Sequence, residues 1–222
     1  MNTYLLEIGL EEMPAQMILP AVEQLKSLAQ KTCEKQRLNF NDLKTYSSPR
    51  RLSIELSGLP DKENDRKVEL KGPPLSVAKD DHNNWTQAAL GFARKNNVSL
   101  KNLETKTIEG KDYLFVQQRE LGQHVPELLQ ESAKQWISQL NFPKNMRWGS
   151  YKTRFIRPIR WVVSLWNSKL VPIKLEMLVA GNQTRGHRFL STGYSNIKHA
   201  SDYEHHLYDL KVIADFEKRR QS

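Results

Sequence analysis

The sequence has only one cysteine among its 222 residues, Cys33. A single thiol excludes an internal disulfide framework and a zinc site built from several thiolates. No apolar run approaches the roughly 18 residues that a membrane-spanning helix needs, so we expect no membrane partner. The first residues lack a basic lead and carry Glu7, Glu11 and Glu12 where a secretory signal peptide needs an apolar stretch. The sequence therefore predicts a mature cytoplasmic protein.

The sequence also lacks the motifs that usually mark a catalytic or nucleotide-binding centre. It has no P-loop, no glycine-rich dinucleotide fingerprint, no GxSxG nucleophile elbow and no HExxH zinc helix. Among its six histidines, His205 and His206 are adjacent, so on a helix they cannot both face one ion. The acidic pairs at 11–12 and 80–81 fit the positive end of a helix and a polar loop better than acid–base chemistry. We predict no catalytic residue and no metal site in this chain.

Positive charge is concentrated in one segment. The chain carries a formal net charge of +9, and residues 141–190 hold ten basic residues against one acid, Glu176. Basic and acidic residues balance over the rest of the chain. A localised basic patch points to a polyanionic partner more strongly than evenly spread charge does.

Apolar periodicity predicts a domain that mixes helices and strands. Ile18, Val22, Leu25, Ala29 and Cys33 follow one another at helical spacing, which predicts a helix over 14–36 with the cysteine on its buried side. The other expected elements are a strand at 4–10, two strands over 45–57 around a turn at 48–50, a strand at 68–71 stopped by residues 72–74, a helix at 86–96, a hairpin over 105–119, a helix at 125–140, a loop at 141–153, strands at 155–166 and 170–179, and a loop at 180–193.

These elements predict a mixed α/β (α+β) fold, in which a mixed sheet is packed against helices. We expect one N-terminal domain over residues 1–200. Ser201 and Glu204 have capping-box spacing, so a helix is expected to start there and to run to the end of the sequence. Residues 201–222 would then be the first helix of a helical region whose remainder is missing.

Four short clusters combine arginine with aromatic residues, glycine or proline, at 48–52, 146–149, 155–161 and 184–189. The planar guanidinium fork of arginine suits phosphate, and aromatic faces can stack on unpaired bases. The same arginines could instead pair with the acidic N-terminal half or with another subunit, and Trp161 fits a core strand. The candidate nucleic-acid or subunit contacts are Arg50, Arg51, Arg147, Trp148, Arg154, Arg157, Arg185, His187 and Arg188.

These clusters resemble the N-terminal part of the beta subunit of the bacterial two-subunit glycyl-tRNA synthetase. The first matching stretch reads EIGLEEMP, where the family usually has E-I-G-x-E-E-L-P. Each stretch is weak alone, but their order across the whole chain makes the resemblance specific. Family beta subunits are about three times longer and continue into an HD-type helical domain and an anticodon-binding domain. The seven matching stretches are residues 5–14, 48–52, 71–74, 146–149, 155–161, 184–189 and 212–220.

The resemblance implies a supporting role in the ATP-dependent attachment of glycine to tRNA(Gly). In this family the active site for ATP, magnesium and glycine belongs to a separate alpha subunit, so this chain is expected to bind no cofactor and to be non-catalytic alone. It would contribute tRNA binding and assembly with the alpha subunit, as two alpha plus two beta chains. The alternatives are a free-standing RNA-binding module and a structural module whose basic patch docks the alpha subunit.

Overall fold

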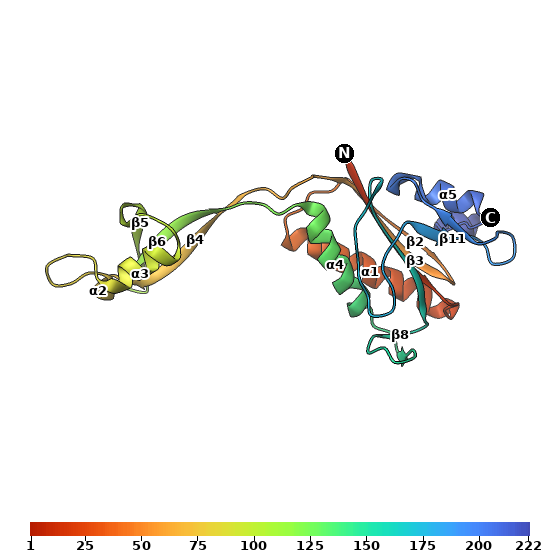
Figure 1. Cartoon of the computed structure of the whole chain (residues 1–222), viewed down its shortest axis with the longest axis horizontal. Helices are drawn as coiled ribbons and strands as arrows, with labels where there is room; N and C mark the ends of the chain where they lie inside the picture. The colour runs from red at the N-terminus through yellow and green to blue at the C-terminus, as the bar shows by residue number, and fades with distance from the viewer. The chain divides into compact units, whose positions relative to one another are not determined.

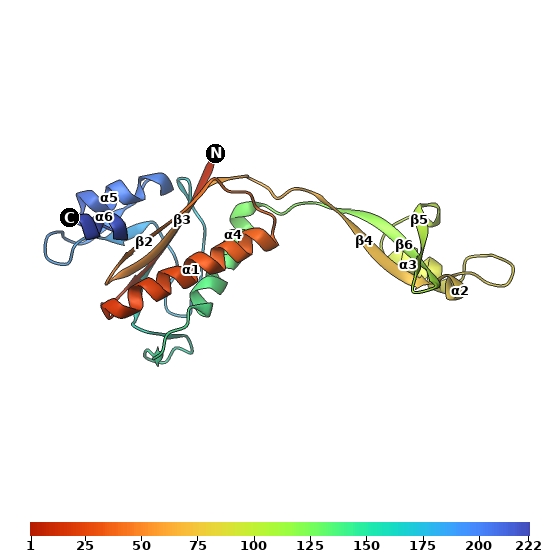
Figure 2. The ribbon, with the colours of Figure 1, turned by 180° about the vertical axis from the view of Figure 1, so that it is seen from behind.

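A computed structural model describes residues 1–222, which divide into two compact units. The first unit comprises Met1–Glu63 and Gln123–Ser222, and the second comprises Asn64–Gly122 (Figures 1 and 2). This division differs from the single domain expected over residues 1–200. The second unit is inserted between two segments of the first, and residues 201–222 pack within the first unit.

The first unit is built on a five-stranded sheet in the order β10-β9-β1-β3-β2. All neighbouring strands pair antiparallel, whereas a mixed sheet was expected. The central strand β1 places Ile8 opposite Leu52 on one side and Val162 on the other. The strands are β1 (Asn2–Leu10), β2 (Asp42–Ser48), β3 (Arg51–Leu59), β9 (Ile159–Trp166) and β10 (Lys169–Leu170).

Two helices, α1 (Ala15–Lys35) and α4 (Val125–Gln139), cover one face of this sheet. The predicted stripe of α1 is buried, and Trp136 of α4 donates its indole N–H to the Thr32 hydroxyl at 2.9 Å. Cys33 is 1% exposed, and burial raises the pKa of its thiol to about 11. The prediction that Cys33 is a core residue is therefore confirmed.

The opposite face of the sheet is covered by the C-terminal segments. Leu5, Trp161 and Val163 pack there against Tyr203 and Leu207. Strand β1 is therefore buried on both faces, which places Glu7 in the interior. The covering elements are β11 (Gln183–Arg185), β12 (Tyr194–Asn196), the 3-10 helix η2 (Ala200–Asp202), α5 (Tyr203–Asp209) and α6 (Phe216–Gln221).

The single helix predicted from residue 201 to the end is wrong. Helix α5 ends because Lys211 adopts a left-handed φ of 64°. The N–H of Val212 then bonds the Leu207 carbonyl at 2.8 Å, and that of Lys211 bonds the Tyr208 carbonyl at 2.9 Å. This is the Schellman arrangement, in which the left-handed residue is usually glycine. Because that residue is a lysine here, the sequence does not indicate where the helix ends. Helix α6 restarts where the Asp215 side chain caps the N–H of Lys218.

Three strand boundaries also differ from the predictions. The strand expected at 170–179 is reduced to β10, because Pro172 has no N–H with which to continue the ladder. The loop expected at 180–193 contains β11, which pairs with β12. In the second unit, β4 runs from Arg66 to Pro74 instead of stopping at residue 71, with a register shift before Pro74.

The second unit consists of a three-stranded antiparallel sheet with short helices against it. Its order is β4-β6-β5, and its core contains Ala78, Ala89 and Leu114, with Trp85 and Phe92 packed against them. The hairpin predicted over 105–119 and the helix over 86–96 are both present. The elements are β4 (Arg66–Pro74), α2 (Leu75–Ala78), α3 (Gln87–Lys95), η1 (Leu100–Asn102), β5 (Leu103–Ile108) and β6 (Lys111–Glu120).

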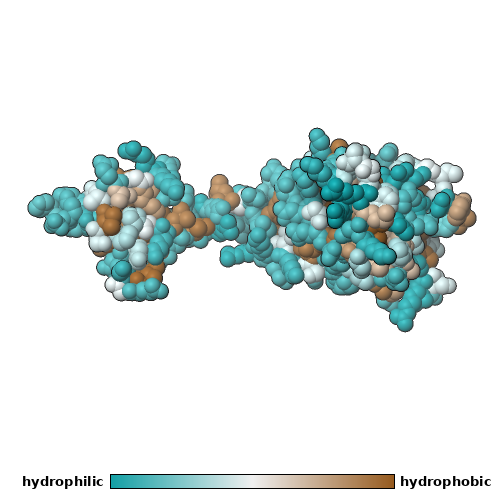
Figure 3. All heavy atoms as spheres, turned by 90° about the horizontal axis from the view of Figure 1, so that it is seen from below, coloured by the Kyte–Doolittle hydropathy of each residue, from teal (hydrophilic) through white to brown (hydrophobic).

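None of the helices has the length and apolar character needed to cross a bilayer. The surface of the first unit is mainly hydrophilic in the view of Figure 3. Hydrophobic side chains nevertheless reach the surface at the right-hand tip of that view. The loop over residues 186–193 lies at the corresponding tip in Figure 1.

The buried carboxyl of Glu55 on β3 is expected to make stability depend on pH. Burial raises its pKa from 4.5 to about 7, with Glu204 and Asp42 adding repulsion that Lys44 partly offsets. The folded state therefore binds this proton more tightly than the unfolded state. The free energy of unfolding should fall by about 1–3 kcal/mol as the pH rises from about 4.5 to 7, and should level off above that.

Urea unfolding between pH 4.5 and 8.5 measures this effect. The Glu55→Gln variant should lose this component of the pH dependence and should be more stable than the parent at pH 8. The matched variant Glu69→Gln, at a partly exposed position in the second unit, should keep it. An unchanged pH profile in Glu55→Gln would contradict the assignment.

Candidate nucleic-acid interface

Two segments far apart in the sequence bring arginines together at one end of the sheet. The turn between β2 and β3 carries Arg50, and β11 carries Arg185. The turn is held at the end of β1, because the N–H of Leu10 bonds the Arg50 carbonyl at 2.8 Å and that of Met13 bonds the Pro49 carbonyl at 2.7 Å. Arg50 therefore occupies a position fixed by the sheet itself.

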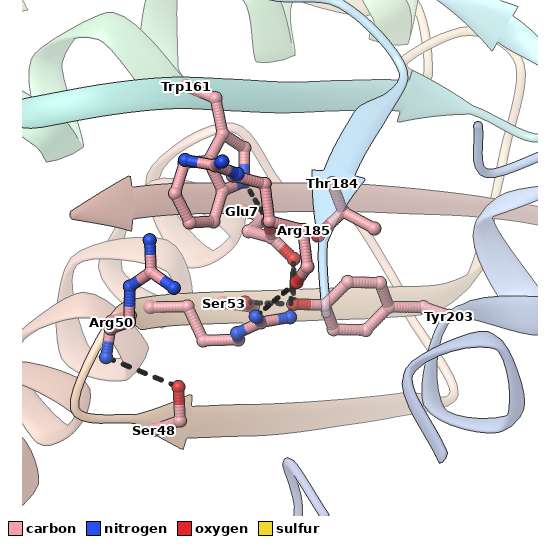
Figure 4. Close-up of polar contacts among 9 residues, drawn as sticks. Glu7, Ser48, Arg50, Ser53, Trp161, Thr184, Arg185 and Tyr203 are labelled. Atoms are coloured by element: carbon pink, nitrogen blue, oxygen red, sulfur yellow. Dashed lines mark hydrogen bonds and ion pairs between the residues drawn. The ribbon is translucent and has the colours of Figure 1, made fainter. Parts of the chain in front are cut away.

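A buried carboxylate, Glu7, anchors β11 to the sheet. Its side chain is fully buried and accepts hydrogen bonds from the Trp161 indole, from the Tyr203 hydroxyl and, at 2.6 Å, from the Thr184 hydroxyl. Tyr203 also shares a 2.5 Å hydrogen bond with Ser53. Figure 4 shows these side chains converging from β1, β3, β9, β11 and α5. Burial and the Glu7 charge raise the pKa of Tyr203 well above its usual value, so its hydroxyl remains a donor.

Arg51 completes this network as a buried cation. It is 1% exposed; its Nη1 lies 3.7 Å from Glu7 Oε2, and its Nη2 donates to the Arg185 carbonyl. Its Nε and Nη1 have no hydrogen-bond partner, so the Glu7 carboxylate is the main group that compensates its buried positive charge. The direct nucleic-acid or subunit contact predicted for Arg51 does not fit this burial. Arg51 instead holds β11, and with it Arg185, in place.

A polar hollow of about 200 Å³ opens between the β2–β3 turn and the segment after β11. Burial lowers the pKa of Arg50, and the charge of Arg185 lowers it further; Glu11 partly offsets this, and Arg51 and Arg188 lower the pKa by smaller amounts. The guanidinium groups therefore repel one another across the hollow, which favours a bound anion. The lining residues are Glu11, Arg50, Arg185, Gly186, His187, Arg188, Ser191 and Gly193, and we call this the arginine pocket.

Acidic residues of the N-terminal segment partly neutralise the rim of the arginine pocket. Arg188 pairs with Glu12 at 3.0 Å, and Arg160 pairs with Glu11 at 3.2 Å. Each of these side chains is about half exposed, and exposed pairs contribute about 0–1 kcal/mol. The internal pairing considered as the alternative for Arg188 is therefore present, but it is weak enough for a ligand to replace it.

The loop after β11 is held closely against the C-terminal layer. A Cβ on Gly186 would lie 2.6 Å from the Leu210 carbonyl oxygen, so glycine is required for this approach. The His187 N–H donates to the same carbonyl at 2.9 Å. We expected Gly186 to permit a backbone bend that brings Arg185 and Arg188 together. Both arginines do line one pocket, and the need for glycine comes from close packing.

The other predicted contact residues lie outside the arginine pocket. Arg147 and Arg154 are exposed on a small hairpin of β7 (Met146–Arg147) and β8 (Arg154–Phe155). Their backbones lie opposite each other in the strand ladder. Trp148 is half-buried and donates its indole N–H to the Phe155 carbonyl at 3.1 Å. Arg157 donates to the Glu12 carbonyl at 2.9 Å. Figure 1 shows β8 below the sheet, apart from β11.

Sequence analysis missed three residues of the arginine pocket. Glu11 was assigned to the positive end of a helix, and Ser191 and Gly193 stood in a segment interpreted as loop. Ser191 is placed by donating its hydroxyl to the His187 carbonyl at 2.9 Å. Gly193 has a left-handed φ of 70° just before β12. Gly193, directly before the strand β12, is the one feature of the sequence that indicates a turn here.

Comparison with known proteins finds relatives along nearly the whole chain. A family model described as the glycyl-tRNA synthetase beta subunit matches residues 4–222. The glycine–tRNA ligase beta subunit of Lactiplantibacillus plantarum is 44% identical over 99% of this chain and 31% of its own length. That of Desulfitobacterium hafniense is 41% identical over 99% of this chain and 32% of its own length. The chain thus spans about a third of the length of these curated relatives. It belongs to the glycyl-tRNA synthetase beta subunit family and corresponds to the N-terminal part of its members.

Proposed function

We propose that this chain supports tRNA binding and subunit assembly for the ATP-dependent attachment of glycine to tRNA(Gly), as the N-terminal part of a glycine–tRNA ligase beta subunit. The observation that carries the proposal is the arginine pocket, where Arg50, Arg185 and Arg188 surround one polar hollow. The proposal assigns ATP, magnesium and glycine activation to a separate alpha subunit. It also assigns the chain to an assembly of two alpha and two beta subunits.

The charge distribution supports a polyanionic ligand. The arginine pocket receives two of its three arginines from the segment over 141–190, which carries the whole net charge of the chain. Neutralising phosphates with arginine releases condensed counterions, so affinity for tRNA should fall steeply as salt is raised. If the chain bound RNA through its net charge alone, the removal of any three arginines would weaken binding equally.

Docking of the alpha subunit is the second candidate function of the arginine pocket. Arg188 pairs with the Glu12 carboxylate, so a carboxylate of a partner subunit is also a chemically suitable ligand for this surface. Co-purification of the 222-residue chain with an alpha subunit, before and after substitution of Arg185, distinguishes the two. Loss of co-purification with unchanged tRNA binding would assign the pocket to the subunit.

Replacing Arg188 with glutamate is expected to weaken tRNA(Gly) binding by about 1–3 kcal/mol. The substitution puts a negative charge on the rim of the arginine pocket, and it breaks the exposed pair with Glu12 and the exposed contact of the guanidinium with the Phe189 ring. The thermal midpoint should therefore stay nearly unchanged. Fluorescence anisotropy with labelled tRNA(Gly) at several salt concentrations, together with thermal melting, measures both quantities.

Arg66→Glu is the matched control. It makes the same charge change and breaks an equally exposed pair with Glu120, but neither residue of that pair lines the arginine pocket. We expect it to weaken binding by much less than Arg188→Glu. Equal losses in the two variants would show that binding follows net charge alone. Normal tRNA binding by Arg188→Glu, with a midpoint several degrees lower, would show that the pair with Glu12 is structural.

A further inference from the structure

The tip of the loop over residues 186–193 exposes large apolar side chains beside the arginine pocket. Phe189 is 83% exposed and Leu190 is 69% exposed. Tyr194, which follows the loop on β12, is 49% exposed. Adjacent exposed apolar side chains on an otherwise hydrophilic surface mark a place where a partner binds (Figure 3).

This loop is held in one conformation by its own hydrogen bonds. The His187 Nδ1 accepts from the backbone N–H groups of Phe189 and Leu190, each at 3.2 Å. The His187 carbonyl accepts from the Ser191 hydroxyl at 2.9 Å and from its N–H at 3.2 Å. The backbone at Phe189 is therefore held in place with its side chain exposed, which lowers the entropy cost of ordering the loop on binding.

The aromatic rings of this surface lie among guanidinium groups. The Arg188 guanidinium carbon is 5.5 Å from the centre of the Phe189 ring, and that of Arg185 is 4.8 Å from the centre of the Tyr194 ring. Both arginines also line the arginine pocket. An exposed ring next to a cationic pocket is the arrangement with which proteins hold single-stranded nucleic acid, because the ring stacks on a base while the cations neutralise its phosphate.

We propose that the loop over 186–193 binds an unpaired nucleotide of RNA. Phe189 stacks on its base, and the adjoining phosphate enters the arginine pocket between Arg50, Arg185 and Arg188. A base inside a duplex has both faces covered by its neighbours, so the site selects single-stranded RNA over double-stranded RNA. The inference rests on the proposed function and adds to it the kind of RNA element that this surface recognises.

Binding of two RNA probes by variants of the 222-residue chain tests this inference. The probes are a labelled ten-nucleotide oligouridine and a blunt twelve-base-pair RNA duplex. Phe189→Ala should weaken oligouridine binding by about 5–100-fold, since stacking on one base contributes this much, and should leave duplex binding within about twofold. Phe189→Trp keeps an aromatic face and should restore oligouridine binding. The thermal midpoint should not move, because the ring is exposed.

Leu190→Ala is the matched control, because it removes a neighbouring exposed apolar side chain that has no aromatic face. It should change oligouridine binding by less than about threefold. Equal losses in Phe189→Ala and Leu190→Ala, or equal losses for oligouridine and duplex in Phe189→Ala, would overturn the inference. So would a Phe189→Ala variant that loses co-purification with the alpha subunit and binds oligouridine normally.

The two proposals fail in different ways. If Arg188→Glu weakens tRNA binding and Phe189→Ala leaves oligouridine binding unchanged, the proposed function stands and the stacking site is wrong. If the unsubstituted chain binds neither tRNA nor oligouridine, the proposed function itself is wrong for this chain.

Discussion

Replacing Glu7 with alanine is expected to lower the free energy of unfolding by about 3–5 kcal/mol. The variant leaves the buried guanidinium of Arg51 without its main compensating charge, since two of its nitrogens have no hydrogen-bond partner. It also removes the acceptor of the Trp161 and Thr184 donors. A loss of this size is a large part of the stability of an ordinary domain, so the variant should be partly unfolded near physiological temperature.

Denaturant unfolding of Glu7→Ala, Arg51→Ala and the double variant measures the coupling between the two charges. Each single variant leaves one charge buried alone, so the double variant should be less destabilised than the sum of the two by about 1–3 kcal/mol. Glu12→Ala is the matched control, because it breaks an exposed carboxylate–arginine pair and should cost less than about 0.5 kcal/mol. A Glu7→Ala variant as stable as Glu12→Ala would show that the buried network contributes little.

Much of the fold could be predicted because it depends on local periodicity. The stripe of α1 and the alternation in β1 and β3 each determine which side chains are buried, and these elements lie where they were predicted. The boundaries that failed have two different causes. β11 exists because it pairs with β12, a contact that local periodicity does not indicate, and α5 ends because Lys211 takes the left-handed conformation that glycine usually supplies.

Four of the nine predicted contact residues, Arg50, Arg185, His187 and Arg188, line the arginine pocket, and their partners were not predicted. The clusters around Arg50 and Arg185 were recognised from composition, and the structure brings them together. Strand register places Glu7 opposite Ser53, so that Arg51, two residues further along β3, reaches it. The sequence alone does not show which residues of two strands lie opposite one another. Arg51 is buried because it opens β3, which is covered on both faces, whereas Arg50 lies in the preceding turn and is half-buried.

Replacing Arg50, Arg185 and Arg188 together with alanine is expected to lower the affinity of the chain for tRNA(Gly) by about 10²–10⁴-fold. The arginines that surround the phosphate site are all lost, so the dependence of log Kd on log salt should become shallower by about one unit. The corresponding triple lysine variant keeps the charge and loses the planar fork. It should keep the salt dependence while binding with intermediate affinity.

A triple alanine variant at Arg147, Lys152 and Arg154 is the control, because it removes the same charge from exposed positions on and between β7 and β8. We expect it to weaken binding by less than about fivefold, and an equal loss in both triple variants would contradict the arginine pocket as the site.

Thermal melting of the two triple variants separates a loss of binding from a loss of folding. Arg50 is repelled by Arg185 and Arg188, whereas Arg188 pairs with the exposed Glu12 and Arg185 lies over the Tyr194 ring, so the alanine variant should melt within a few degrees of the parent. Binding lost without a comparable loss of stability is the result expected of a site kept for an anionic ligand, because a structural cluster would lose both.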